Sequence, residues 1–391
     1  MRLYNTMTRA LDTFEPGPIV TLYVCGVTPY DTTHLGHAFS YSTFDVLIRL
    51  LHSLGHEVRY TQNVTDIDDD ILRKARELGV DWAWLGRDQT AKFVRDMADL
   101  NMLPPTHYPR ATDEIPGMIA TIARLLESGH AYRVESNVYF SSTSVADFGA
   151  LARLDRKQML ERFEETGDPP TDPRKRDALD FVLWKESAPG EPVWQTPWGA
   201  GRPGWHIECS TMAVHYLGPR IDIHGGGDDL IFPHHSCEIV QSEAATGEAP
   251  FVTIWMHNAA VKLGGIKMSK SLGNLVMART LLERYPAGAI RLYLHRHHYR
   301  HAFEYEEQRL EDAARLYERM AAFAQSGEPG IEPAERSEVR DVRRRVYGAL
   351  ADDLDTPLAI DALATLLEST DPAAPAALRE LAGLIGVLFP G

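Results

Sequence analysis

Cysteine and long apolar runs are the scarcest features of this sequence. Only three cysteines occur in 391 residues, Cys25, Cys209 and Cys237, and this odd number predicts no disulfide framework and favours a reducing compartment. The thiols are therefore candidates for metal binding or reactivity. No run of about eighteen apolar residues occurs, and the N-terminal "MRLYNTMTRALDTFEPG" lacks the apolar core of a signal peptide. Both absences predict a soluble cytoplasmic protein that does not engage a membrane.

Positive charge is also in short supply. Lysine and arginine total 40 against 55 aspartate and glutamate residues, which gives a formal net charge of -15. This balance argues against a protein that grips nucleic acid through overall basicity, although it leaves room for a local basic patch. With 44% hydrophobic residues the composition is that of a globular protein, and the length suits two or three domains. No internal repeat is visible, and we expect a monomer.

Two strand and helix units open the chain. The run "IVTLYVCG", bounded by Pro18 and Gly26, predicts a buried strand. Apolar residues at 44, 47, 51 and 54 then fall on one helical face and Gly55 supplies a stop, so a helix is predicted from about 34–37. The segment "HEVRYTQNVTD" predicts a second strand, followed by the helical "DIDDDILRKARELG". This order predicts an α/β fold with a doubly wound parallel sheet.

The remaining chain divides by pattern. Proline, glycine and charge clusters predict an irregular insertion, the sheet resumes at "RIDIHGGGDDLIF" and "PFVTIWMHN", and spaced Leu, Ala and Val then predict helices. The expected domains are a Rossmann-like catalytic first half over 1–125, a connective insertion over 126–197, the catalytic second half over 198–300 and a C-terminal helical bundle over 301–391.

Three groups of residues carry chemistry. His34 and His37 fall in the first turn of a helix after a strand, where backbone N–H groups favour an anion such as a nucleotide phosphate, or where the histidines simply cap the helix. The glycine-bracketed "GGIKMSKSLGN" holds Lys267 and Lys270, and its alternative is a solvated basic loop. Metal-ligand side chains form the third group, although buried cysteines are often only small hydrophobes. They are Cys25, Cys209, His234 and Glu238, the last two spaced to share one helix face.

The words "HLGH" and "KMSKS" together resemble the two signature motifs of class I aminoacyl-tRNA synthetases. The resemblance implies that His34, His37, Lys267 and Lys270 are catalytic, binding ATP with its Mg²⁺ and stabilising the α-phosphate while a substrate carboxylate attacks it. Adenylation of this kind needs in-line positioning and cationic donors rather than a protein nucleophile. The flanking glycines would let the lysine loop close over ATP and reopen.

The wider wording, "YVCG", "GRPGWHIECS", "IDIHGGGDDLIFPHHSCEIVQSEAATG" and "KMSKSLGN", resembles cysteinyl-tRNA synthetases. The resemblance implies that Cys25, Cys209, His234 and Glu238 bind zinc, and that the metal takes the thiolate of substrate L-cysteine. Zinc binds a thiolate far better than a neutral hydroxyl, so the metal would reject serine. Cys237 and His235 have no part in this scheme and are expected to be structural.

The same resemblance places further residues around the substrates. It implies a cysteine pocket lined by Thr28, Thr65 and Trp205, with Asp229 offering a carboxylate to an ammonium group or to ribose hydroxyls. An aspartate after glycines is equally typical of a turn. The remaining expected nucleotide contacts are Gly36, Ser40, Asn63, Gly226, Gly227, Val261, Met268 and Ser269.

Two related families share this machinery and differ in the acceptor. Cysteinyl-tRNA synthetases charge tRNA(Cys), whereas the cysteine ligase of mycothiol biosynthesis acylates the amine of glucosaminyl-inositol. "CGVTPYDTTHLGHAFSY" and the end at "LIGVLFPG", without a basic anticodon-binding segment, resemble the ligase, and "EETGDPPTDP" does so in part. Glu238, "IDIHGGG" and "EIVQSEAATG" resemble the tRNA enzymes. We prefer the ligase, with a tRNA synthetase and an inactive cysteine- or nucleotide-binding paralogue as alternatives.

Overall fold

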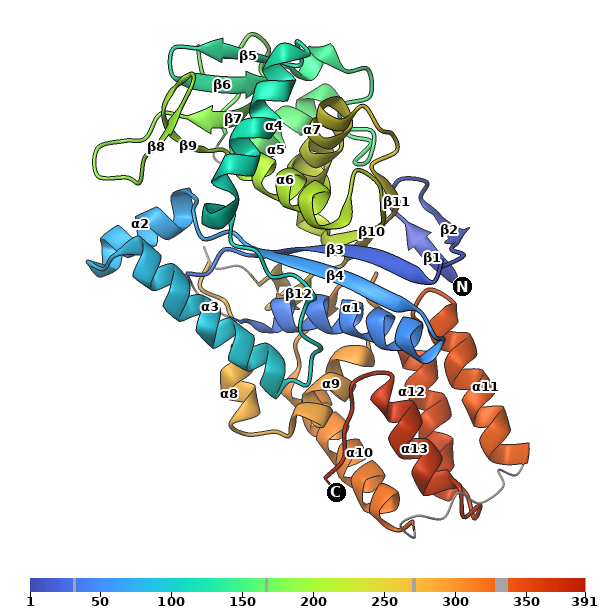
Figure 1. Ribbon diagram of the computed structural model, residues 1–391. Helices are drawn as coiled ribbons and strands as arrows, with labels where there is room; N and C mark the ends of the chain where they lie inside the picture. The colour runs from blue at the N-terminus through green and yellow to red at the C-terminus, as the bar shows by residue number, and fades with distance from the viewer. Residues whose placement is uncertain (31–32, 166–167, 269–271, 328–336, 391) are drawn as a thin grey trace.

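A four-stranded parallel sheet forms the centre of the molecule (Figure 1). The computed structural model describes residues 1–30, 33–165, 168–268, 272–327 and 337–390. The strand order is β11-β10-β3-β4, and every neighbouring pair is parallel. The strands are β3 (Ile19–Val27), β4 (Glu57–Val64), β10 (Ile221–Gly227) and β11 (Val252–Asn258). After β3 the chain adds β4 on one side of this strand and later β10 and β11 on the other side. The doubly wound topology predicted from the sequence is thus confirmed.

Helices cover both faces of this sheet. Helix α1 (Leu35–Ser53) lies along one face and is buried over most of its length. On the other face α6 (Trp205–Leu217) contacts β3 and β4, and α7 (Ser236–Thr246) packs on α6. Two further helices, α2 (Asp69–Leu78) and α3 (Trp82–Asp99), form a hairpin that extends away from the sheet (Figure 1). The site described below lies at the ends of the central strands, between these two layers of helices.

The insertion is more regular than its sequence predicts. It holds a five-stranded antiparallel sheet in the order β5-β6-β7-β9-β8, packed with α4 (Ile115–Glu127) and α5 (Arg156–Glu165). Its strands are β5 (Ala131–Val134), β6 (Asn137–Phe140), β7 (Phe181–Lys185), β8 (Trp194–Thr196) and β9 (Gly199–Pro203). The segment was expected to be an irregular insertion without core strands. It adds no strand to the central sheet, but it has regular strands of its own. These strands have three to five residues, and β6 is buried on both faces, so no alternation marks them in the sequence.

Two small sheets complete the strands. A hairpin of β1 (Arg2–Asn5) and β2 (Ala10–Thr13) lies beside β11. The short strands β12 (Val261–Leu263), β13 (Ile266–Lys267) and β14 (Phe303–Glu304) form the other. This second sheet carries the first lysine of the "KMSKS" segment.

Helices make up most of the chain after β13. Two of them, α8 (Ala278–Leu282) and α9 (Ala287–His295), precede the region 301–391 that was predicted to be helical. The described part of that region holds α10 (Glu307–Gln325), α11 (Ser337–Ala351), α12 (Thr356–Ala364) and α13 (Ala374–Gly383). A turn separates α11 from α12, where Asp353 and Leu354 have positive φ values of 60° and 52°. Pro357 then starts α12, and Asp355 caps it by accepting a hydrogen bond from the Leu358 N–H. In the described part of the chain no helix is both long and apolar enough to cross a bilayer.

A buried arginine joins this region to the catalytic layer. Arg291 on α9 is fully buried and pairs with the carboxylate of Asp45 on α1. It also donates hydrogen bonds to the carbonyls of Leu100 and Ile385, at 3.2 and 2.8 Å. A Cβ at Gly386 would lie 2.1 Å from the guanidinium carbon, so only glycine fits there. One side chain therefore connects α1, the end of α3 and the C-terminal segment.

Candidate active site

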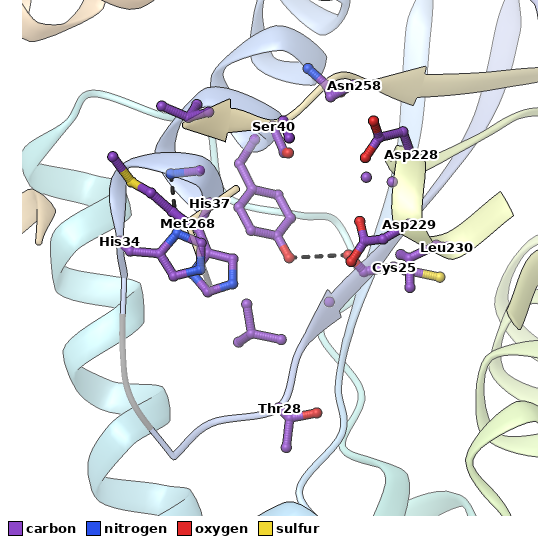
Figure 2. Close-up of a pocket in the computed structure, with 18 of the residues that line it drawn as sticks. Cys25, Thr28, His34, His37, Ser40, Asp228, Asp229, Leu230, Asn258 and Met268 are labelled. Atoms are coloured by element: carbon purple, nitrogen blue, oxygen red, sulfur yellow. Dashed lines mark hydrogen bonds between the residues drawn. The ribbon is translucent and has the colours of Figure 1, made fainter. Parts of the chain in front are cut away.

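A cavity of about 760 Å³ opens at the carboxyl ends of β3, β10 and β11. This is the edge at which doubly wound sheets bind their ligands. Figure 2 shows His34 and His37 on one side of the cavity and Asp228 and Asp229 on the other. The predicted residues among its lining are Cys25, Thr28, His34, Gly36, His37, Ser40, Gly226, Gly227, Asp229, Val261, Lys267 and Met268.

The two histidines are placed by the start of α1. His34 is the N-cap, and its Nδ1 accepts a hydrogen bond of 3.1 Å from the Gly36 N–H. The rings of His34 and His37 stack with centroids 3.7 Å apart. A Cβ at Gly36 would lie 2.9 Å from the His34 ring, which explains the glycine between the two histidines. The capping and cavity-lining interpretations are thus compatible, because His34 does both.

Lys267 reaches the cavity from the opposite side. It ends β13 after a turn at Gly264 and Gly265, whose φ values of 65° and 78° favour glycine. Its Nζ lies 3.0 Å from Asp229 Oδ1 and 3.5 Å from Asp228 Oδ1. In this arrangement the lysine is therefore held by two carboxylates of the cavity wall. Met268 follows it and is buried. Ser269 and Lys270 lie outside the described residues.

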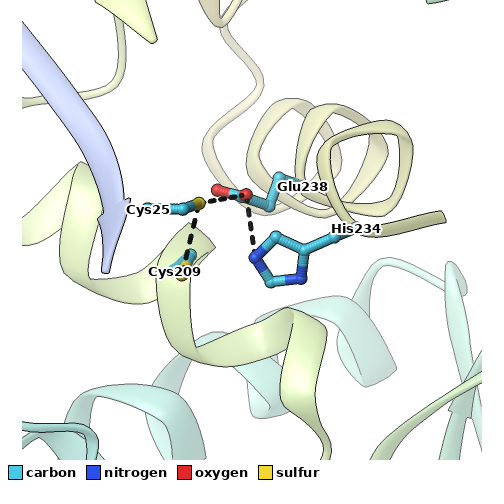
Figure 3. Close-up of side chains that lie close together, drawn as sticks. All are labelled: Cys25, Cys209, His234 and Glu238. Atoms are coloured by element: carbon cyan, nitrogen blue, oxygen red, sulfur yellow. Dashed lines mark hydrogen bonds and ion pairs between the residues drawn. The ribbon is translucent and has the colours of Figure 1, made fainter. Parts of the chain in front are cut away.

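The candidate metal ligands lie close together (Figure 3). One ligand atom from each of four buried residues lies within 4.8 Å of all the others, and the residues are Cys25 on β3, Cys209 on α6, His234 before α7 and Glu238 on α7. The two sulfur atoms are 3.8 Å apart, and His234 Nε2 is 3.2 Å from Glu238 Oε1. Two thiols, an imidazole and a carboxylate form a donor set that suits zinc.

Electrostatics favour the ligating forms of the imidazole and the carboxylate, but not that of the Cys25 thiol. Burial, followed by a contact with the Cys209 thiol, raises the pKa of Cys25 well above its ordinary value of 9.0. Burial lowers the pKa of His234 to about 3, which keeps its imidazole neutral at pH 7. Burial acts to raise the pKa of Glu238, but the imidazoles of His224 and His234 outweigh it and lower that pKa. A bound metal would then need only to displace protons from the thiols.

Sequence reasoning missed part of this cluster. A second group of candidate ligands shares Cys25 and Glu238 and adds His224 and His235. His235 Nε2 lies 3.3 Å from Cys25 Sγ, and His224 Nε2 lies 3.0 Å from Glu238 Oε2. His235, expected to be only structural, therefore borders the metal group. Its signal in the sequence was the double histidine "PHH". Cys237 is buried and belongs to neither group.

Three predicted residues lie around the metal group. Asn63 Oδ1 accepts a hydrogen bond of 2.7 Å from the Gly26 N–H and lies 3.5 Å from Cys209 Sγ. Its amide donates to Thr65 Oγ1 at 3.1 Å, and the Trp205 ring stacks on His234 with centroids 4.3 Å apart. The described lining of the cavity includes none of the three. Asn63 therefore contacts Gly26 and Cys209, and its expected contact with the adenylate stays a prediction.

Comparison with known proteins identifies the family. The model of the "tRNA synthetases class I (C) catalytic domain" matches residues 13–315, which is most of the chain. The chain belongs to this class I synthetase family. Enzymes of the family use ATP, and the described residues include a group able to hold a metal ion.

Relatives of this class I synthetase carry two different names. A cysteine–tRNA ligase of Thioalkalivibrio sulfidiphilus is 47% identical over 99% of this chain and 85% of the relative. A protein of Thermobispora bispora named L-cysteine:1D-myo-inositol 2-amino-2-deoxy-alpha-D-glucopyranoside ligase is 43% identical over 99% of this chain and 95% of the relative. The resemblance seen in the sequence is thus confirmed for both families.

A solved structure confirms the fold of this class I synthetase. Methionyl-tRNA synthetase of Mycobacterium tuberculosis, in complex with methionyl-adenylate, has a TM-score of 0.66 at 17% identity. The match covers 94% of this chain and 88% of the other. At this identity the comparison speaks for the fold alone.

Several residues that line the cavity were not predicted from the sequence. Tyr41 follows the histidine motif on α1 and donates a hydrogen bond of 3.0 Å to the Cys25 carbonyl. The others are Tyr30, Asp70, Arg73, Lys74, Asp228 and Asn258. Most of them lie outside the two signature motifs, and only the fold brings them to the cavity.

Proposed function

We propose that this protein activates L-cysteine with ATP to form cysteinyl adenylate, and then transfers the cysteinyl group to the amine of glucosaminyl-inositol. One observation carries the first step. Cys25 belongs both to the candidate metal group and to the wall of the cavity that His34, His37 and Lys267 line. A site for a thiol and a site for a nucleotide phosphate therefore share one cavity.

We propose zinc as the ion held by Cys25, Cys209, His234 and Glu238. When bound, zinc would take the thiolate of the substrate and so discriminate cysteine from serine. The chain supports this selection with the buried partners of its ligands. Asn63 contacts Cys209, and Trp205 stacks on His234. Outer partners of this kind fix the orientation of metal ligands.

The activation step uses the opposite end of the cavity. The cysteine carboxylate attacks the α-phosphorus of Mg²⁺-ATP, the bond from that phosphorus to the β-bridging oxygen breaks, and pyrophosphate leaves. The start of α1 presents His34 and His37, and Lys267 supplies a cation that stabilises the charge passing to pyrophosphate. For this Lys267 must exchange its carboxylate partners, Asp228 and Asp229, for phosphate oxygens.

In the second step the acceptor amine attacks the carbonyl carbon of the adenylate. The bond from this carbon to the phosphate oxygen breaks, AMP leaves, and the amine loses a proton to water. The named ligase of Thermobispora bispora, matched over nearly the whole of both chains, supports this acceptor. So does the ligase-like wording around His34 and His37.

Transfer to tRNA(Cys) is the second candidate. Glu238 lies within the candidate metal group, and a glutamate at this position resembles the tRNA enzymes. The cysteine–tRNA ligase at 47% identity supports the same alternative. Either acceptor is compatible with a cytoplasmic location, where the three free thiols would stay reduced.

The test separates activation from transfer. ATP–pyrophosphate exchange is measured with cysteine and with serine, and AMP release is then followed with glucosaminyl-inositol or with tRNA(Cys), each product being identified by mass spectrometry. We expect exchange with cysteine, none above background with serine, and an amide on the sugar. Charged tRNA without amide would select the second candidate. Absence of exchange with cysteine would favour the third alternative, an inactive paralogue that binds cysteine or a nucleotide.

A further inference from the structure

One wall of the cavity has no part in the reaction as described so far. Cys25 is the member of the metal group that lines the cavity. In the proposed reaction His34, His37 and Lys267 face the phosphates, and the ends of β10 and β11 form a third side. The remaining wall consists of Tyr30 in the loop after β3 and of Asp70, Arg73 and Lys74 on the first turns of α2.

Hydrogen bonds hold this wall against the strand that carries Cys25. Thr28 Oγ1 donates a bond of 2.9 Å to Asp68 Oδ2, and Asp68 Oδ1 caps α2 by accepting the Ile71 N–H at 2.8 Å. Two residues along, Asp70 Oδ2 accepts a hydrogen bond of 3.2 Å from the Tyr30 hydroxyl. Since Thr28 and Tyr30 follow Cys25 closely in the chain, the wall lies beside the place where the cysteinyl group would sit.

The wall mixes donors and acceptors. Asp70 accepts the Tyr30 hydroxyl on one carboxylate oxygen and pairs with Arg73 Nη2 at 2.7 Å on the other. Its side chain is about half exposed and lines the cavity, so the carboxylate keeps lone pairs that can accept further hydrogen bonds. A binding site for a polyanion would be lined by cations without neighbouring carboxylates. Here the carboxylate of Asp70 offsets the charge of Arg73, and the chain as a whole carries a net charge of -15. Adjacent hydroxyl, carboxylate and guanidinium groups suit a polyhydroxylated amine.

We propose that Tyr30, Asp70 and Arg73 form the acceptor subsite, and that it takes a polyhydroxylated amine whose nitrogen is directed at the cysteinyl carbonyl. Asp70 is the central group, because its carboxylate can accept hydrogen bonds from the amine or from neighbouring hydroxyls. This inference rests on the proposed function and adds to it where the second substrate binds.

The test compares Asp70→Asn with Glu77→Gln. Glu77 is a matched control: it is on α2, it also pairs with Arg73, at 3.1 Å, and it does not line the cavity. For each form, cysteine-dependent ATP–pyrophosphate exchange reports the first half-reaction, and the KM for glucosaminyl-inositol reports the second. A hydrogen bond to a charged group contributes enough for its loss to raise that KM about ten- to hundredfold. We expect this rise in Asp70→Asn alone, with exchange unchanged in all three forms.

The outcomes are distinct. Equal acceptor KM values in Asp70→Asn and the parent would overturn the subsite, as would an equal rise in Glu77→Gln. Transfer by the parent to tRNA but not to the amine would overturn the acceptor class. Absence of exchange in the parent would instead contradict the proposed function itself. A loss of exchange confined to Asp70→Asn would also count against the subsite, because the acceptor has no role in that step.

Discussion

At the scale of single residues, the three cysteines have different surroundings. Cys25 and Cys209 lie in the candidate metal group with their sulfur atoms 3.8 Å apart, whereas Cys237 is buried outside it. Burial raises the pKa of both Cys25 and Cys237, so burial alone does not separate them. Cys25 and Cys209 differ from Cys237 because they lie close to His234 and Glu238.

Cys209→Ala should therefore remove the metal, and Cys237→Ala should not. We expect about one zinc per chain in the parent and in Cys237→Ala, and nearly none in Cys209→Ala. Mutation of a residue that only hydrogen-bonds to a metal ligand typically lowers the metal affinity about ten- to hundredfold. Loss of a ligand itself should therefore lower the zinc affinity at least as much. Metal content by mass spectrometry, together with cysteine-dependent exchange, provides the measurement. Equal zinc in the two variants would contradict the assignment.

Lys267 is the other residue whose role can be isolated. Its cross-strand partner on β12 is Lys262, which does not line the cavity and serves as the control. Removal of a preorganised donor to developing charge costs about 10²–10³-fold in kcat. We expect a loss of this size in ATP–pyrophosphate exchange for Lys267→Ala, with zinc content and melting temperature unchanged. Lys262→Ala should retain nearly full activity, and a comparable loss there would point to a general charge effect.

At the scale of elements, the start of α2 combines a helix cap with a buried charge. Asp68 accepts hydrogen bonds from the Ile71 N–H and the Thr28 hydroxyl. Burial, aided by the charges of Asp70 and Asp69, raises its pKa from the ordinary 3.8 to about 6. Between these values the folded chain holds more protons than the unfolded chain, so the contribution of Asp68 to stability falls as the pH rises through this window.

Asp68→Asn should consequently stabilise the protein at pH 7.5. Asparagine caps helices as well as aspartate does and carries no charge to bury. The two-unit shift corresponds to about 3 kcal/mol, and we expect a gain of about 1–3 kcal/mol at pH 7.5 that shrinks towards zero below pH 4. Denaturant unfolding of both proteins at several pH values measures the difference. A constant difference across the range would show that ionisation of Asp68 is not its source.

The helices and strands also show how much of the fold could be predicted from the sequence. Strand β3 and helix α1 follow from a continuous apolar run and a 3.6-residue period. The insertion sheet escapes prediction because its strands are too short to show a period. The metal group was found through the family resemblance, whereas the positions of His224 and Asp70 depend on tertiary packing.

At the scale of the whole molecule, Arg291 connects the catalytic layer to the C-terminal helices. Burial lowers its pKa, and Asp45, Leu100 and Ile385 supply its partners. Removing one member of a buried ion pair typically costs about 3–5 kcal/mol, because the other charge remains buried.

Arg291→Ala should lower the free energy of unfolding by about this amount. Arg296→Ala is the control, because Arg296 pairs with Asp361 on the surface, where such pairs contribute about 1 kcal/mol or less. Guanidinium titrations of the parent and both variants measure the costs. Similar midpoints for the two variants would show that the buried junction is no more important than a surface pair.

The same junction has a consequence for biosynthesis. Asp45 leaves the ribosome long before Arg291, and Arg291 long before Ile385 and Gly386. Until these later residues emerge, the first helix of the catalytic layer carries a carboxylate without its full set of partners. Folding during translation proceeds from the N-terminus, and this layer can therefore collapse early but reaches its final packing only when the chain beyond α13 docks. We therefore expect the cavity to reach its final packing only after the segment that holds Ile385 and Gly386 has been synthesised.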